Sequence, residues 1–117
     1  MVNSRRKGIR YELEVMHKYK QAWFKNAKTS RFVSKLTDDK WVDIVEVDPF
    51  LPQCKNYKSN FSVKQAIELL KRIKKQFKHW FPLVHCRLTE KRKSVVIIDE
   101  NDFFTLLWKL NEIKDIL

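Results

Sequence analysis

The 117-residue chain is 44% hydrophobic and 13% aromatic, a composition that suits one small packed domain and excludes a disordered or low-complexity protein. Its 25 lysines and arginines against 14 aspartates and glutamates give a formal net charge of +11, which is typical of a protein that binds a polyanion such as nucleic acid. No apolar run approaches the about 18 residues of a membrane span, and no signal-peptide pattern opens the chain. We therefore expect a single domain over residues 1–117 in the cytoplasm (the host cytoplasm if the source is viral), without membrane contact.

Residues 4–25 are predicted to form an amphipathic helix. On a 3.6-residue wheel its apolar stripe consists of Ile9, Leu13, Met16, Tyr19, Lys20 and Trp23. Glu12 lies inside this stripe, whereas Glu14 lies on the far side as an ordinary surface acid. A carboxylate on a buried face needs a cation or a hydrogen-bond donor to offset its desolvation. Glu12 is therefore either paired with a basic residue at the rim of the helix or part of a functional site.

Residues 26–40 are expected to hold a short first strand near 31–33, followed by a polar turn at 38–40. Arg31 and Ser34 could donate hydrogen bonds to phosphate, which is how proteins usually contact a nucleic-acid backbone. The alternative for these residues is a solvated loop.

The stretch 41–57 is predicted to form two short strands joined by a tight Asp-Pro connection, because β-branched and aromatic residues dominate it and prolines interrupt it. Alternation along the second strand places Gln53 and Lys55 on one face and Cys54 on the other. Asp43 shares its face of the first strand with two valines. A carboxylate, an amide oxygen and an ammonium group are thereby brought to one place.

This grouping has a chemical use. Mg²⁺ binds hard oxygen ligands and keeps several waters, so one or two carboxylates and a phosphate oxygen suffice to hold it. A lysine beside such an ion can stabilise the charge that develops on a phosphate under attack. The stretch therefore indicates a phosphodiester hydrolysis centre, and the alternative is a β-hairpin whose Asp and Lys face solvent.

Ser62 and Gln65 form a capping-box pattern at the start of a second helix, which is predicted to run to about residue 79. Its buried stripe is predicted to contain Val63, Ala66, Ile67, Leu70, Ile73 and Phe77. The opposite face carries Lys64, Lys71, Arg72, Lys74, Lys75 and Lys78, which only Glu68 offsets. Like charges three or four residues apart repel, so this face favours an anionic partner. The alternative is a solvated lysine-rich surface.

Residues 83–89 and 94–99 are predicted to pair as an antiparallel hairpin, and Asp99 or Asn101 can cap a last helix over 102–116. The buried stripe of that helix is predicted to contain Phe103, Leu106, Leu107, Leu110, Ile113 and Leu117. Trp108 falls outside the stripe, as a residue of a dimer contact would. Neither cysteine has a zinc-ligand spacing, so two reduced thiols are expected. The whole order predicts an α/β sandwich with a mixed sheet.

These elements, with Lys7-Gly8-Ile9-Arg10-Tyr11-Glu12, Val42-Asp43-Ile44-Val45, Gln53-Cys54-Lys55 and Gln65-Ala66, resemble the PD-(D/E)xK nuclease superfamily. Within it the chain is most similar to the archaeal-type Holliday junction resolvases and their small viral relatives. The resemblance covers nearly the whole chain. It implies a restriction-endonuclease-like core, which is a mixed five-stranded sheet flanked by helices in the order αβββαββα.

Carried over residue by residue, the resemblance implies that Glu12, Asp43 and Gln53 hold Mg²⁺, for which Mn²⁺ could substitute, and that Lys55 is the catalytic lysine. It implies a homodimer that cuts four-way DNA junctions, with Arg31 and Ser34 at the substrate phosphate. The other residues expected on the DNA backbone are Arg5, Arg6, Lys7, Lys64, Lys71, Arg72 and Lys75.

The chain departs from the family pattern at Gln53, where most members have glutamate. An amide oxygen can ligate Mg²⁺ but brings no charge, so the metal affinity should be lower and Glu12 more important. We therefore expect a magnesium-dependent endonuclease of branched DNA. The alternatives are a DNA-binding module without catalysis and a nuclease of the same fold that acts on ordinary duplex.

Overall fold

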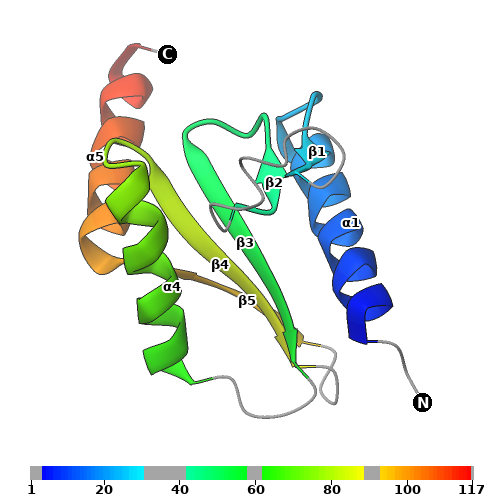
Figure 1. Cartoon of the computed structure of the whole chain (residues 1–117). Helices are drawn as coiled ribbons and strands as arrows, with labels where there is room; N and C mark the ends of the chain where they lie inside the picture. The colour runs from blue at the N-terminus through cyan, green and yellow to red at the C-terminus, as the bar shows by residue number, and fades with distance from the viewer. Residues whose placement is uncertain (1–3, 31–41, 58–61, 89–92, 117) are drawn as a thin grey trace.

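A computed structural model of the protein describes residues 4–30, 42–57, 62–88 and 93–116. In these residues the order of elements is helix, three strands, helix, two strands, helix, as predicted (Figure 1). The elements are α1 (Ser4–Ala22), β1 (Lys28–Thr29), β2 (Ile44–Val45), β3 (Phe50–Tyr57), α4 (Val63–Gln76), β4 (Phe81–Leu88), β5 (Lys93–Ile98) and α5 (Glu100–Ile116). The protein is therefore of the α/β class. The first strand expected near 31–33 lies outside the described residues.

The predicted five-stranded sheet is wrong for the described residues, because the strands form two sheets. β3 pairs with β4 in parallel and β4 with β5 antiparallel, whereas β1 and β2 form a separate antiparallel pair. One backbone hydrogen bond, from the Asp43 N–H to the Pro52 carbonyl at 2.8 Å, links the two sheets. Pro52 has no N–H to return, and Glu46 at φ 65° turns the chain away after β2. The hydrogen-bonding between the β2 segment and β3 therefore stops after this bond.

The buried face of α1 differs from the predicted stripe. Tyr11, Val15 and Met16 pack against the β1–β2 pair and Cys54 of β3, while Leu13 is exposed and Trp23, beyond the end of the helix, is 82% exposed. A contact between α1 and Arg87 on β4 sets the buried face of the helix, and the spacing of apolar residues along α1 does not reveal this contact. Arg87 lies over the Tyr11 ring, 4.7 Å from its centroid, and pairs with Glu14. Glu14 is therefore an ion-pair partner of the sheet and not an ordinary surface acid.

The helix α4 covers the other face of the sheet. Its capping box is confirmed: Ser62 Oγ accepts from the Gln65 N–H and Gln65 Oε1 accepts from the Ser62 N–H, both at 3.1 Å. Ala66, Leu69, Leu70 and Ile73 are buried. Leu69 and Leu70 pack with Val84 and Cys86, and Ile73 packs with Leu51. The predicted stripe missed Leu69 and wrongly included the exposed Val63 and Ile67. The helix ends at Gln76, three residues before the predicted end.

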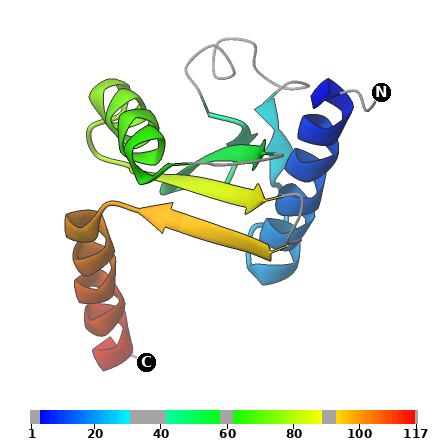
Figure 2. The same ribbon diagram turned by 90° about the horizontal axis from the view of Figure 1, so that it is seen from below.

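The β4–β5 hairpin and the cap of the last helix are confirmed. Asp99 Oδ2 accepts from the Asp102 N–H at 3.2 Å, so Asp99 and not Asn101 is the cap. The predicted burial of the α5 stripe is wrong for its described members, and Leu117 lies outside the described residues. Among the described residues of α5, Asp102 and Leu106 are half-buried and the others are exposed. The helix follows an edge strand and leads away from the sheet (Figure 2), so the sheet does not cover its apolar side chains.

No described helix combines the length and the apolar character needed to cross a bilayer.

A half-buried histidine connects α1 to the sheet. The Tyr19 hydroxyl lies 2.6 Å from Nε2 of His85 on β4. Burial, with a smaller contribution from the Lys18 ammonium, holds the pKa of His85 at about 4, below its ordinary value of 6.5. The folded imidazole is therefore neutral at pH 7, and its Nε2 can accept a hydrogen bond from the Tyr19 hydroxyl.

We expect His85 to make the free energy of unfolding pH-dependent. Its pKa is lower in the folded state, so the unfolded chain binds more protons between pH 6.5 and 4 and stability falls as the pH falls through this window. Between pH 7 and 4.5 the loss should be about 2 to 3 kcal/mol. Urea unfolding of the wild type and of His85→Gln at both pH values measures it. The exposed His17→Gln should keep the wild-type dependence, and an unchanged dependence in His85→Gln would refute the assignment.

Candidate functional site

Asp43 lies where the two sheets meet, and three hydrogen bonds of 2.8 Å fix it there. Its carbonyl accepts from the Ser30 N–H, its N–H donates to the Pro52 carbonyl, and its Oδ2 accepts from the Cys54 N–H. The Asp43 side chain therefore lies along the outer edge of β3, and the residue is only 7% exposed. The alternative of a solvent-facing aspartate is wrong.

The predicted alternation along β3 is confirmed. Gln53 pairs in register with Val84 and Lys55 with Cys86, both of which pack beneath α4, while Cys54 packs on the α1 side. Gln53 is buried and Lys55 is half-buried. Gln53 and Lys55 are therefore held by the sheet rather than by a loop, one on either side of the residue whose N–H binds Asp43.

Glu12 lies at the centre of the buried face of α1 and is 4% exposed. At about 100° per residue, its side chain falls between those of Val15 and Met16, which both pack into the core. The prediction that Glu12 occupies a buried position is therefore confirmed, although the stripe around it is different.

The Cys54 thiol lies within the electrostatic influence of these groups. Burial raises its pKa, the carboxylates of Asp43 and Glu12 raise it further, and the Lys55 ammonium lowers it. Lys55 is the sequence neighbour of Cys54, and its side chain lies on the opposite face of β3. Cys54 stays a protonated thiol, which excludes it as a nucleophile at neutral pH. The sequence pattern predicted Glu12, Asp43 and Lys55 as site residues but gave no role to Cys54.

The donor set suits a hard divalent cation. Glu12 and Asp43 are buried carboxylates and Gln53 is a buried amide, and Mg²⁺ or Mn²⁺ prefers oxygen ligands of these kinds. The structure does not bring all three to one face, because Gln53 lies on the α4 face of β3 and Glu12 on the α1 face. A zinc site would need nitrogen or thiolate ligands, and the raised pKa of Cys54 opposes a thiolate. Within the described ranges no three His, Cys, Asp or Glu side chains form a metal-binding cluster. The Gln53 amide oxygen would therefore have to serve as the third protein ligand.

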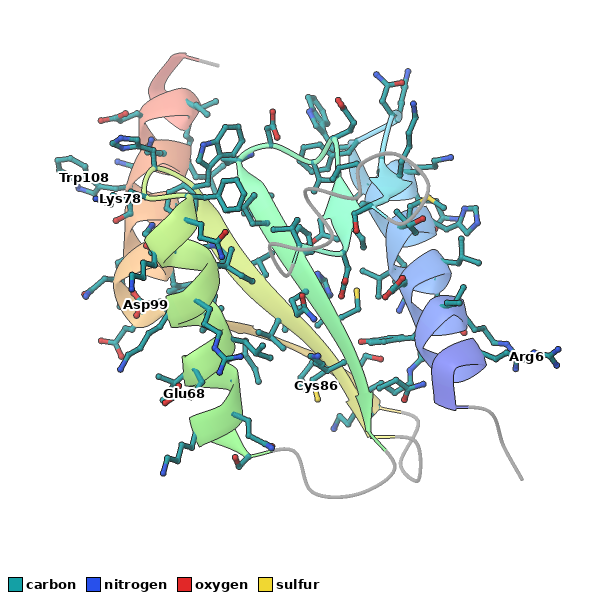
Figure 3. All side chains as sticks on the ribbon, in the orientation of Figure 1. Arg6, Glu68, Lys78, Cys86, Asp99 and Trp108 are labelled. Atoms are coloured by element: carbon teal, nitrogen blue, oxygen red, sulfur yellow. The ribbon has the colours of Figure 1, made fainter. Side chains whose placement is uncertain are left out.

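Exposed basic side chains lie on both α1 and α4. Both α1 and α4 begin at the end of the sheet where β3 finishes (Figure 1). Arg6 is exposed and projects away from α1 (Figure 3), and the predicted DNA-binding residues Lys64, Lys71, Arg72 and Lys75 are exposed on α4. The side chains of Arg5 and Lys7, and the whole of Arg31 and Ser34, lie outside what the structure describes.

Lys74 does not belong to this basic surface. Its Nζ donates to the Trp80 carbonyl at 2.7 Å and to Asp102 Oδ1 at 3.2 Å, and it lies over the Phe81 ring. Including Lys74 in the cationic face of α4 was therefore wrong, because the residue joins α4 to α5.

A pocket of about 400 Å³ lies at the other end of β3. It is lined by Val42, Ile44, Val45, Glu46, Asp48, Phe50, Leu51, Phe77 and Trp80. This lining has two acids and no lysine or arginine, so the pocket does not suit a phosphate group. The acids near Cys54 therefore remain the candidate site for phosphate chemistry.

The chain is an α/β protein with two buried acids, Glu12 on α1 and Asp43 at the outer edge of β3. No family model, no curated protein and no solved structure matches it. The residues of this site are therefore the basis for inferring the activity.

Proposed function

We propose that the protein is a metal-dependent phosphodiesterase whose site consists of Glu12, Asp43, Gln53 and Lys55. The observation that carries this proposal is the burial of two carboxylates, Glu12 and Asp43, where α1 packs on β3, with Asp43 Oδ2 held by the Cys54 N–H. Burying a carboxylate costs free energy, and a bound divalent cation would offset part of that cost.

More particularly, we propose an endonuclease that cleaves branched DNA, with four-way junctions as the preferred substrate. The motifs that resemble the Holliday junction resolvases support this choice, as does the confirmed order of elements. On this proposal the core is restriction-endonuclease-like with a divided sheet, and the enzyme acts as a homodimer. A cytoplasmic location is in keeping with its free cysteines, Cys54 and Cys86.

The residues of the site have distinct roles in the proposed reaction. When bound, Mg²⁺ supplies a Lewis acid and lowers the pKa of a coordinated water. Asp43 is preorganised by the Cys54 N–H, so its carboxylate needs no rearrangement before it binds a cation. Glu12 supplies the second negative charge from α1. Lys55 places an ammonium where charge develops on the attacked phosphate.

The exposed basic residues of α1 and α4 would hold the DNA by its backbone. Lys64, Lys71 and Lys75 carry no sequence information in such contacts, because phosphates are alike along the strand. Binding should therefore be insensitive to sequence and should fall steeply as the salt concentration rises.

One observation favours a second candidate function. Gln53 lies where the family pattern has an acid, so the protein could bind structured DNA without cutting it. This candidate predicts tight junction binding and no product in any metal.

Cleavage of labelled substrates tests the proposal. We expect the protein to cut a four-way junction in Mg²⁺ or Mn²⁺ and not in EDTA, and to cut linear duplex and flap DNA much more slowly. Equal cleavage of duplex would indicate a restriction- or repair-type nuclease. Binding without cleavage in either metal would favour the non-catalytic module and refute the enzyme.

A further inference from the structure

The pocket of about 400 Å³ where β3 begins has no role in the proposed function, and we call it the β3 pocket. Its volume lies within the roughly 300 to 1,000 Å³ that small-molecule sites occupy in proteins. The lining combines aliphatic side chains, three aromatic rings and two acids: Val42, Ile44, Val45, Glu46, Asp48, Phe50, Leu51, Phe77 and Trp80. An apolar interior and an acidic rim together restrict the class of ligand that fits.

Hydrogen bonds hold the walls of the β3 pocket in place. The β2–β3 connection and the turn between α4 and β4 meet at this end of the sheet (Figure 1), where the Phe81 N–H donates to the Pro49 carbonyl at 2.9 Å. Within the turn the Trp80 N–H donates to the Phe77 carbonyl at 3.2 Å, and Lys74 Nζ donates to the Trp80 carbonyl at 2.7 Å. The pocket is therefore formed before a ligand arrives, so little ordering entropy opposes binding.

The interior of the pocket is apolar and aromatic. Val42 and Leu51 are buried, and they pack in one cluster with Phe77 and Trp80. Phe50, Phe77 and Trp80 are each half-buried, so their rings line the pocket and keep exposed area. A ligand gains free energy when it buries carbon atoms against such a surface, and a cation also gains from the negative face of an aromatic ring. The interior therefore favours an apolar body and accepts a positive charge.

The rim of the pocket is acidic. Glu46 and Asp48 are exposed, and no lysine or arginine belongs to the part of the lining that the structure describes. The whole chain has 25 basic residues against 14 acids, so this rim runs against the average charge of the protein. Lys74, which donates to the Trp80 carbonyl, is paired with Asp102 outside the pocket at 3.2 Å. The rim would therefore attract a cation and repel an anion.

The backbone of Glu46 supports a role for its side chain. The residue has φ 65°, a left-handed conformation that residues other than glycine rarely adopt. A glycine would adopt this conformation at lower cost, so the geometry of the turn does not explain the glutamate. Backbone strain of this kind is concentrated at functional and ligand-binding sites. A carboxylate that is needed at the rim would account for it.

We propose that the β3 pocket binds a small organic cation, which is an ammonium group carried on an apolar or aromatic body. The ammonium would lie at the rim beside the Glu46 and Asp48 carboxylates, and the body would lie against Phe77 and Trp80. None of the lining residues belongs to the proposed metal site. The inference is therefore independent of the nuclease proposal, and failure of either leaves the other in place.

Titration of the full-length, isotopically labelled protein with three ligands of one shape, followed by two-dimensional NMR, tests the charge requirement. The ligands are the cation 2-phenylethylammonium, the neutral 2-phenylethanol and the anion 3-phenylpropionate. We expect the cation to bind with a Kd below about 1 mM, the alcohol at least about 10-fold more weakly, and the anion not at all. No binding of the cation at about 10 mM would overturn the proposal, as would equal binding of the alcohol.

The same spectra locate the bound cation. The indole N–H signal of Trp80, identified by its loss in Trp80→Phe, should shift during the titration because this ring lines the pocket. The indole signal of Trp108 should not shift, because Trp108 is 75% exposed on α5 and does not belong to the lining. A shift of the Trp108 signal without one of Trp80 would overturn the assignment of the site.

Two matched double variants test the acids. Glu46→Gln with Asp48→Asn removes both charges from the rim and keeps the size of the side chains, and it should raise the Kd of the cation at least about 5-fold. Glu68→Gln with Glu112→Gln removes two charges from exposed positions of α4 and α5 and should leave the Kd unchanged. Thermal unfolding shows that each variant is folded. Wild-type affinity in the first double variant would overturn the proposal.

Glu46→Gly separates lost binding from lost folding. Glycine relieves the strain at φ 65°, so this variant should unfold at a temperature no lower than the double variant Glu46→Gln with Asp48→Asn, while it binds the cation more weakly than the wild type. Unchanged binding in Glu46→Gly would show that the Glu46 carboxylate does not hold the cation, and the proposal would be wrong.

Discussion

Replacing Asp43 by asparagine is expected to reduce metal-dependent junction cleavage at least about 100-fold while the fold and DNA binding persist. Asparagine keeps a carbonyl oxygen that can accept the Cys54 N–H, so the 2.8 Å hydrogen bond that positions the side chain can remain. What is lost is one of two negative charges at the proposed metal site. Cleavage rates in saturating Mg²⁺, with junction affinity measured by fluorescence anisotropy in EDTA, separate the two effects.

Two further substitutions make this test specific. Asp43→Ala removes the acceptor as well as the charge and leaves the buried Cys54 N–H without its hydrogen-bond acceptor. It should therefore also lower the free energy of unfolding by about 1 to 3 kcal/mol. Asp102→Asn makes the same chemical change in the ion pair with Lys74 and should leave the cleavage rate unchanged. If Asp43→Asn cleaved as fast as the wild type, Asp43 would be a structural residue and the metal site would be wrong.

Local interactions made much of the fold predictable from sequence. The capping box of Ser62 and Gln65, the Asp99 cap and the β4–β5 hairpin each depend on residues within a few positions of one another. The alternation that separates Gln53 and Lys55 from Cys54 follows from strand geometry alone. These predictions are confirmed because no distant contact competes with them.

The errors come from features that depend on distant partners. The buried face of α1 is set by Arg87 and Cys54, which are far away in the sequence. Periodicity identified α5 as apolar on one side but carries no information on whether this chain covers that side. The sheet divides because β1 and β2 are two residues long each, and propensity does not show where a ladder stops.

The candidate site was predictable in part. Glu12 and Asp43 stood out as acids in apolar surroundings, and both are buried. The sequence gives no signal that Cys54 lies among them, because that placement needs the packing of α1 on β3. Lys74 was grouped with the DNA-binding lysines because spacing alone could not reveal its hydrogen bonds to Trp80 and Asp102.

Replacing Gln53 by glutamate is expected to make the protein less stable without metal and to tighten its binding of Mg²⁺ about 10-fold or more. Gln53 is 5% exposed, so the new carboxylate would lie in the interior of the protein. A buried charge is unfavourable, and we expect a loss of about 1 to 3 kcal/mol in EDTA. At the proposed site a bound divalent cation would offset this loss and gain a charged ligand.

Thermal unfolding in EDTA and over a Mg²⁺ series measures both effects, because a ligand that binds only the folded state stabilises it by RT ln(1 + [L]/Kd). The stability gained from Mg²⁺ should therefore be larger for Gln53→Glu than for the wild type. Gln21→Glu adds the same charge at an exposed position of α1 and should change neither quantity. If Mg²⁺ stabilised Gln53→Glu no more than the wild type, Gln53 would not be a metal ligand. Replacing a ligating amide by a carboxylate adds a negative charge next to the ion and must change its affinity.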